Sequence, residues 1–413
     1  ILAHSSEEAG MPEHLSTARG ATRLTFDSVE GIVNVVEKMH ETIARHPLPL
    51  SPRPEGGSRA HGLIASSIYS LVRGVNATLR EGADLTMKLW PQQAGTDKRL
   101  PREVVWISAV NGVCGDHLEE SGNTLAIDMH FSTPEERLDH DAIATTLPDA
   151  SPHIAVFVHG LCLSPFSWRR RGAMSVGDTL SAKLGMTPVY VGYNTGRHIS
   201  TNGRELSEQL DRLCDAWPVP VESISLVGHS MGGLVIRSAC WYGEAERATW
   251  LALLRRVACL GTPHHGAPLE KAGSLFDRAM QAVQYVDPLL VSRHRSVGIK
   301  DLRHGNLLDE DWAQAGDRDD EVPMHDTRRP VPLPEDVGHY FVAASIGRDA
   351  RDVRGHVLGD FLVRLGSATG AHRDDARHLP VPAEHCRVFH EMSHLDLLSD
   401  PRVHEQIADW FDS

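Results

Sequence analysis

The chain has 413 residues, enough for one elaborated domain or for two or three small ones. Its 55 acidic and 41 basic side chains give a formal net charge of −14, which argues against a general nucleic-acid or anionic-membrane binder. No run of about eighteen apolar residues occurs, so we expect no transmembrane helix. These properties favour an ordinary globular protein and exclude little else.

The six cysteines are scattered and form neither a C-x-x-C pair nor a zinc-like cluster. Cys240 falls in a predicted helix and Cys259 in an apolar strand pattern, which suits reduced, buried thiols in a cytoplasmic protein. A single disulfide stays open as an alternative. The first residues lack both an initiator Met and an apolar signal core, so a processed start and a secreted mature form are the alternative to a cytoplasmic location.

The first 150 residues are predicted to form a mostly helical extension. Apolar side chains recur at helical spacing over residues 29–43 and 64–79, and residues 104–113 repeat the pattern after a further polar stretch. Residues 125–129 are predicted as an edge strand. Because amphipathic helices need a partner surface, we expect the extension to pack either on the main domain or on a second subunit in a homodimer.

From residue 153 the pattern changes to short apolar runs separated by helical segments. Such runs are typical of a mostly parallel sheet covered by helices on both faces, so we expect an α/β domain over residues 151–413. The predicted strands are residues 154–158, 188–193, 224–227, 257–260, 340–344 and 387–389.

A G-x-S-x-G motif is the most informative stretch of the chain, because Ser230 lies between an apolar strand and an apolar helix. A turn this tight needs small residues at Gly228 and Gly232, and it exposes the serine oxygen above the sheet. An ordinary serine in a glycine-rich turn is the alternative, against which the strand before and the helix after both argue. We predict Ser230 as a nucleophile.

A serine hydroxyl is a poor nucleophile at neutral pH and needs donors for the oxyanion that its attack creates. The first strand of the domain ends in His159-Gly160-Leu161, where a glycine turn lets backbone N–H groups point into the site. We assign the oxyanion hole to the N–H groups of Leu161 and of Met231, the residue after the nucleophile.

Residues 266–338 interrupt the alternation of strands and helices, with a helical part near 275–286 and a charged, proline-containing part near 309–336. Because this insertion follows the serine turn by one strand, we expect a substrate lid, with a plain elaboration as the alternative. Its apolar residues have the spacing of ordinary helix packing, so the acyl-chain length of a substrate stays open.

The histidine base is expected on the loop after the last strand, where His394 lies, with His390 as its rival. The carboxylate that orients it should lie between serine and histidine in chain order. Asp349, Asp352 and Asp360 all follow the preceding strand. We choose Asp360, because a glycine-flanked acid before an apolar segment can be held rigidly, whereas the other two lie among arginines.

Together these motifs resemble the α/β-hydrolase superfamily, and more narrowly the bacterial triacylglycerol lipases and the PGAP1-like esterase/lipase group, over roughly residues 150–413. The resemblance rests on His159-Gly160-Leu161, Gly228-His229-Ser230-Met231-Gly232-Gly233, Gly261-Thr262-Pro263-His264-His265-Gly266, Gly359-Asp360-Phe361-Leu362-Val363 and Ser393-His394-Leu395-Asp396. It implies an α/β-hydrolase fold.

The resemblance has one departure and one open question. In those lipases the acid lies in an Asp-Gly-Leu-Val type loop, which Asp360 matches except that Phe361 replaces the glycine. In some of them the aspartate equivalent to Asp396 binds a structural calcium, but a full set of six to eight oxygen ligands is not identifiable here. We therefore predict no metal and no cofactor, and we interpret His264 and His265 as a structural loop or pocket wall.

The resulting expectation is a serine hydrolase that cleaves a small-molecule ester or lipid through an acyl-enzyme intermediate, as a carboxylesterase or lipase. An amidase, lactonase or acyltransferase with the same triad is the alternative among enzymes. A non-catalytic hydrolase-like scaffold that binds a ligand is the alternative outside them.

Overall fold

The computed structural model describes residue 20 and residues 101–169, 173–267, 296–313, 326–349, 352, 359–360 and 362–413. The helices predicted over residues 29–43 and 64–79, and the helical part of the insertion near 275–286, lie outside these ranges. They stay predictions.

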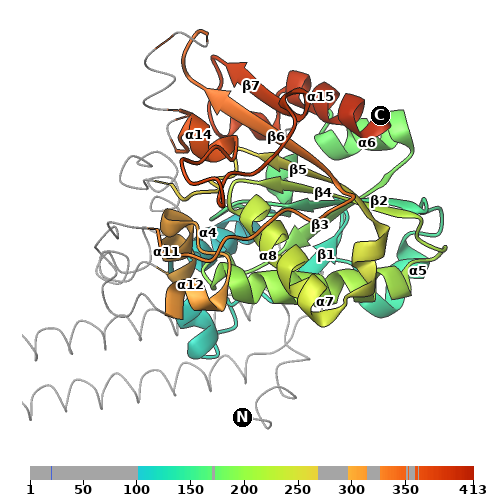
Figure 1. Cartoon of the computed structure of the whole chain (residues 1–413). Coiled ribbons are helices and arrows are strands. Elements are labelled where there is room, and N and C mark those ends of the chain that lie inside the picture. Colours follow the sequence, from blue (N-terminus) through green and yellow to red (C-terminus); the bar gives the residue numbers. More distant parts are fainter. Residues whose placement is uncertain are drawn as a thin grey trace, which may run out of the picture.

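A seven-stranded sheet runs through the molecule in the order β1-β3-β2-β4-β5-β6-β7 (Figure 1). β1 runs antiparallel to β3, and all the other neighbouring strands are parallel. The mostly parallel α/β-hydrolase sheet that the sequence predicted is thereby confirmed. The strands are β1 (His130–Ser132), β2 (His153–Val158), β3 (Thr187–Gly192), β4 (Ser223–His229), β5 (Leu254–Leu260), β6 (Gly338–Ser345) and β7 (Cys386–His390).

Helices cover both faces of this sheet (Figure 1). α7 (Ile199–Ala216) and α8 (Met231–Glu246) lie on one face, and α6 (Val176–Leu184) and α15 (Pro401–Asp412) on the other. The other helices in the described ranges are α4 (Pro101–Glu120), α5 (Ile143–Thr146), α11 (Val297–His304), α12 (Asp309–Ala313) and α14 (Leu365–Ala368). Short 3₁₀ turns lie at His140–Ala142, Pro165–Trp168, Thr249–Leu253, Ala383–His385 and Asp396–Leu398. None of the helices in the described ranges is long and apolar enough to cross a bilayer.

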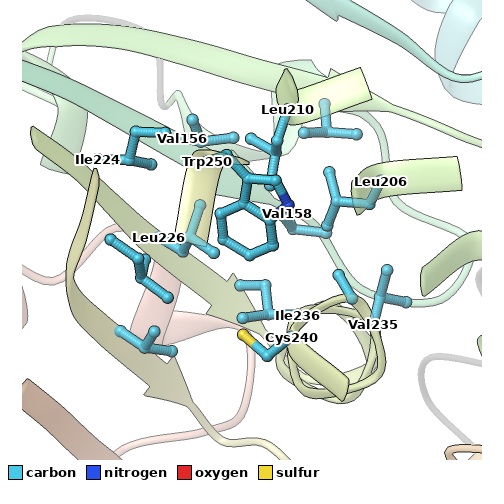
Figure 2. Packing of buried hydrophobic residues seen from close by; sticks show 14 of the residues in the cluster. Val156, Val158, Leu206, Leu210, Ile224, Leu226, Val235, Ile236, Cys240 and Trp250 are labelled. Atoms are coloured by element: carbon cyan, nitrogen blue, oxygen red, sulfur yellow. The ribbon is translucent and has the colours of Figure 1, made fainter. Parts of the chain in front are cut away.

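Successive side chains of the central strands are buried on opposite faces, as the period of two in a β-strand requires. Val156 and Val158 of β2 pack with Leu206 of α7 and Val235 of α8 in the core shown in Figure 2. Phe157, between them in sequence, points to the other face and stacks on Tyr190 with ring centroids 5.1 Å apart. Burial on both faces explains why these strands read as continuous apolar runs.

The edge strand is misplaced in the sequence prediction: residues 125–129 form no strand, and β1 begins at His130. The side chain of Asn111 satisfies the backbone of that segment instead. Its Nδ2 donates to the Leu125 carbonyl at 2.7 Å, and its Oδ1 accepts from the Ile127 N–H at 3.0 Å. An apolar segment whose backbone is bonded by a side chain needs no neighbouring strand.

α4 packs against loops of the sheet. Asn194, after β3, donates from Nδ2 to the Gly115 carbonyl at 2.9 Å, and Ser296, before α11, donates from Oγ to the Gly112 carbonyl at 2.7 Å. Although α4 and β1 belong to the stretch predicted as an extension, both contact the main sheet. The boundary near residue 150 stays a prediction.

The order of the strands reverses at the centre of the sheet. From β2 the chain moves to β3 on one side, and α7 then returns it to β4 on the other side of β2. In open α/β sheets such a switch point leaves a crevice at the carboxyl ends of the two adjacent strands. The segments that leave β2 and β4 therefore define where a site is expected.

Candidate active site

Ser230 occupies the turn between β4 and α8, with φ 54° and ψ −121°. A non-glycine residue in this region is strained, and it persists only where its surroundings hold it in place. Here the N–H of Ser230 donates to the Leu260 carbonyl at 2.8 Å, and its carbonyl accepts from the Gly233 N–H at 3.1 Å. The backbone of the turn is thus fixed from two sides.

The glycines of the motif are required by close contacts. A Cβ at Gly232 would lie 2.1 Å from the carbonyl oxygen of Val158 in β2, and one at Gly228 would lie 2.6 Å from the nitrogen of Gly233. Neither separation is compatible with a side chain. The need for small residues on both sides of Ser230, expected from the sequence, is confirmed.

The loop after β2 lies against Ser230, because a Cβ at Gly160 would be 3.0 Å from the Cβ of Ser230. In this loop the Cys162 N–H donates to Thr195 Oγ1 at 3.2 Å, whereas nothing in the described part of the chain accepts from the Leu161 N–H. Met231 is the first residue of α8, where N–H groups have no partner inside the helix. The two predicted oxyanion donors therefore flank Ser230.

Asp360 and His394 form a buried hydrogen-bonded pair, with Nδ1 of the imidazole 2.6 Å from Oδ2 of the carboxylate. The other carboxylate oxygen, Oδ1, accepts from the N–H groups of Leu362 at 2.9 Å and Val363 at 2.7 Å. Gly359 precedes the acid at φ 57°, and a Cβ there would lie 1.9 Å from the Val363 carbonyl oxygen. The acid is thus held in one orientation.

The carboxylate of Asp360 is ionised despite its burial. Desolvation favours the neutral acid, but the charge and the hydrogen bond of His394 and the two backbone N–H groups outweigh it and lower the pKa below its ordinary value. A carboxylate only accepts hydrogen bonds, so Nδ1 of His394 carries the proton. In the neutral ring Nε2 is then left with its lone pair.

The His394 loop is placed beside the serine turn by two contacts. Nε2 of His229, the neighbour of Ser230, lies 3.1 Å from the His394 carbonyl oxygen. Gly261, at φ 60°, faces the imidazole so closely that a Cβ there would lie 2.9 Å from its Cε1. Gly261 directly follows Leu260, whose carbonyl accepts from the N–H of Ser230, so the loop of His394 adjoins the turn of Ser230 at the carboxyl ends of the central strands.

The rival residues are arranged differently. Asp352 accepts from the backbone N–H of Arg348 at 3.2 Å. His390 ends β7, and its buried Nδ1 has no partner in the part of the chain that the structure describes. Neither rival takes part in the Asp360–His394 contact. Phe361, the departure from the lipase loop, lies outside the described residues.

His229 is the site residue that the sequence did not indicate. Burial first, and then the neighbouring His394, lower its pKa to about 3, so the ring is neutral. Because a carbonyl oxygen only accepts, Nε2 of His229 must be the donor in this contact. The motif places a histidine beside Ser230, but nothing local shows that it reaches a residue 165 positions away.

Asp396, the candidate calcium ligand in the resemblance, accepts from Ser393 through Oδ2, at 3.0 Å from its N–H and 2.6 Å from its hydroxyl. Among the residues that the structure describes, no three histidines, cysteines or acids are grouped as metal ligands would be. His264 is buried against Phe341, with ring centroids 4.3 Å apart, and acts as a packing residue of its loop.

The chain is similar to several solved structures of other proteins. One is the mature lipase BlEst2 of Bacillus licheniformis, with 18% identity and a TM-score of 0.39 over 68% of this chain and 98% of that chain. Another is lipase B of Aspergillus fumigatus, with 11% identity and a TM-score of 0.39 over 70% of this chain and 56% of that chain. A third is the esterase Pf2001 of Pyrococcus furiosus, with 14% identity and a TM-score of 0.36 over 63% of this chain and 83% of that chain. No match was found among the curated proteins.

A family model described as "PGAP1-like alpha/beta domain" matches residues 149–319. This range contains β2 to β5, the loop with Leu161 and the turn with Ser230. The chain thus has the α/β-hydrolase fold, and its residues 149–319 are similar to the PGAP1-like alpha/beta domain.

Proposed function

We propose that the protein is a serine hydrolase that cleaves carboxylic esters through an acyl-enzyme intermediate. The observation that carries the proposal is the 2.6 Å hydrogen bond between His394 and the buried Asp360, on a loop that contacts the strained turn of Ser230. A nucleophile, a base and an orienting acid are the parts that acyl transfer needs.

The proposed mechanism gives each of these residues a defined role. Nε2 of His394 takes the proton of Ser230 as its oxygen attacks the ester carbonyl, and the N–H groups of Leu161 and Met231 bind the resulting oxyanion. His394 then gives the proton to the leaving alcohol. A water molecule, deprotonated by the same histidine, releases the acid and restores Ser230.

Asp360 supports both halves of the reaction. It keeps the proton of the resting imidazole on Nδ1, and its negative charge stabilises the imidazolium that forms when His394 accepts the serine proton. Since Oδ1 is held by two backbone N–H groups, Oδ2 stays directed at the ring.

The lid proposed within residues 266–338 stays a prediction. Its described part is anchored on α7, because Asp301 of α11 accepts from the Ile199 N–H at 3.0 Å and lies 2.8 Å from Nδ1 of His198. Hydrolysis of p-nitrophenyl esters of increasing acyl length would show whether the substrate is a lipid.

Covalent labelling tests the central proposal. A fluorophosphonate should label Ser230 in the wild type, as identified by peptide mass spectrometry, and Ser230→Ala should lose both labelling and hydrolysis of a p-nitrophenyl ester. Ser225→Ala is the matched control, since Ser225 lies buried in the same strand. Retained activity in Ser230→Ala, or labelling at another residue, would overturn the assignment of the nucleophile.

The leaving group is tested with matched substrates. An ester, a thioester and an amide of the same acyl group should be cleaved with the ester strongly preferred over the amide. Efficient cleavage of the amide alone would contradict the ester assignment while leaving the nucleophile intact.

A further inference from the structure

Arg237 is a buried arginine without an acidic partner. It lies on α8, with 6% of its surface exposed. Its Nη2 donates to the Val331 carbonyl at 2.6 Å, and Nη1 lies 3.5 Å from Nδ1 of His264. Its Nε is buried with no acceptor, and no described carboxylate lies within ion-pair distance of the guanidinium.

A buried charge of this kind is unfavourable unless something of opposite sign compensates it. Burial, and to a lesser extent the positive charge of Arg328, lower the pKa of Arg237 to about 10. The group is therefore still protonated at neutral pH. No described carboxylate contacts it directly.

The neighbouring arginines differ from Arg237 in this respect. A small cavity of about 30 Å³ adjoins Arg237, and three more arginines line it. Each of these three has its own carboxylate: Arg328 with Asp326 at 2.6 Å, Arg329 with Glu310 at 3.0 Å and Arg377 with Asp374 at 3.4 Å. A further carboxylate, Asp311, also lines the cavity, and it accepts from the backbone N–H groups of Leu307, Leu308 and Arg329. Arg237 is thus the arginine of this cavity that has no described carboxylate within ion-pair distance.

The second unpaired group at the cavity is also a hydrogen-bond donor. An arginine only donates, so Nδ1 of His264 is the acceptor in its contact with Arg237. Burial, and then the charge of Arg237, lower the pKa of His264 well below its ordinary value, so the ring is neutral and its proton is on Nε2. This Nε2 is buried and has no partner among the described residues.

We propose that the cavity beside Arg237 binds one small monovalent anion of the halide class. Two buried donors without described partners, one of them on an arginine that no described carboxylate contacts, suit an anion. A volume of about 30 Å³ holds one or two water-sized particles and so admits a single-atom anion more readily than a phosphate. The bound anion neutralises Arg237 and joins α8 to the segment before β6.

Halide-dependent thermal stability tests the proposal at constant ionic strength. When sodium gluconate is replaced stepwise by sodium chloride, the Tm of the wild type should rise saturably by about 2–4 °C. Arg237→Met should lose this dependence, and Arg402→Met should keep it because Arg402, on α15, is exposed, is paired with Asp400 and does not line the cavity. Ser230→Ala should also keep it, which separates the anion site from the proposed catalytic function.

Crystals of the wild type grown or soaked in sodium bromide give a second measurement that needs no variant. An anomalous peak should appear between the guanidinium of Arg237 and the ring of His264. A wild-type Tm that does not respond to chloride, or a cavity that holds only water in bromide, would overturn the proposal.

Discussion

The side chain of His229 donates a hydrogen bond to the main-chain carbonyl of His394, 3.1 Å away. The two rings also lie close together, with centroids 4.7 Å apart. His229 is fixed by the strained turn of Ser230, so this contact ties the loop of the proposed base to the proposed nucleophile. The position of the His394 loop relative to Ser230 is therefore set by the same turn that holds Ser230.

Replacing His229 should therefore slow catalysis without changing substrate binding. We expect His229→Leu to lower kcat on the order of 10²-fold with little change in KM, because a small misplacement of the base is costly and His229 itself is fully buried. His229→Gln can place an amide donor near the position of Nε2 and should recover part of the loss. A wild-type kcat in His229→Leu would contradict the positioning role.

Asp360→Asn should lower kcat by about 10⁴-fold. The amide oxygen can still accept from Leu362 and Val363, so the amide nitrogen would face Nδ1 of His394. This forces Nδ1 to accept and moves the imidazole proton to Nε2, where a base is needed. Asp352→Asn, at the rival acid, serves as the control and should keep wild-type kcat.

A side chain at position 112 should disturb the loop of the proposed oxyanion donor. In α4, a Cβ at Gly112 would lie 2.2 Å from Sγ and 2.9 Å from the nitrogen of Cys162, the residue after Leu161. We expect Gly112→Ala to lower kcat and the rate of fluorophosphonate labelling. Adding Cys162→Gly removes the closer contact and suits the backbone, since Cys162 has φ 60°. An equally slow double variant would show that the effect does not pass through this contact.

Stability should fall on acidification from about pH 6.5. Burial lowers the pKa of His159 and His339 to about 4 and that of His229 to about 3, from an ordinary value of 6.5. Between these pKa values the unfolded chain binds protons that the folded chain does not. Each histidine therefore lowers the free energy of unfolding by about 1.4 kcal/mol for every pH unit of acidification. Above pH 6.5 these groups contribute no pH dependence.

Urea unfolding at pH 7.5, 6.0 and 5.0 measures the slope of the free energy of unfolding against pH. His339 lies away from the proposed site and bonds the Pro334 carbonyl through Nε2 at 3.1 Å. His339→Gln should reduce the slope by the share of one histidine. An unchanged slope in that variant would mean that His339 is not held neutral by burial.

Much of the fold could be predicted from the sequence because the central strands are buried on both faces. β2 to β7 lie within three residues of the apolar runs that predicted them. The serine turn was equally recognisable, since its close contacts restrict Gly228 and Gly232 to the smallest residue. The edge strand was misplaced because Asn111 bonds the backbone of the apolar segment before it.

By itself, the sequence determined the strands, the turn around Ser230 and the chain order in which Asp360 and His394 follow it. Local patterns suffice for these features, because hydrophobic periodicity and glycine spacing report how a segment is buried. Only the tertiary structure decided that Asp360 reaches His394, that His229 holds the loop of His394, that α4 supports the Leu161 loop and that Arg237 is left without an acid. These contacts join residues distant in the chain, and they depend on how the helices and strands pack.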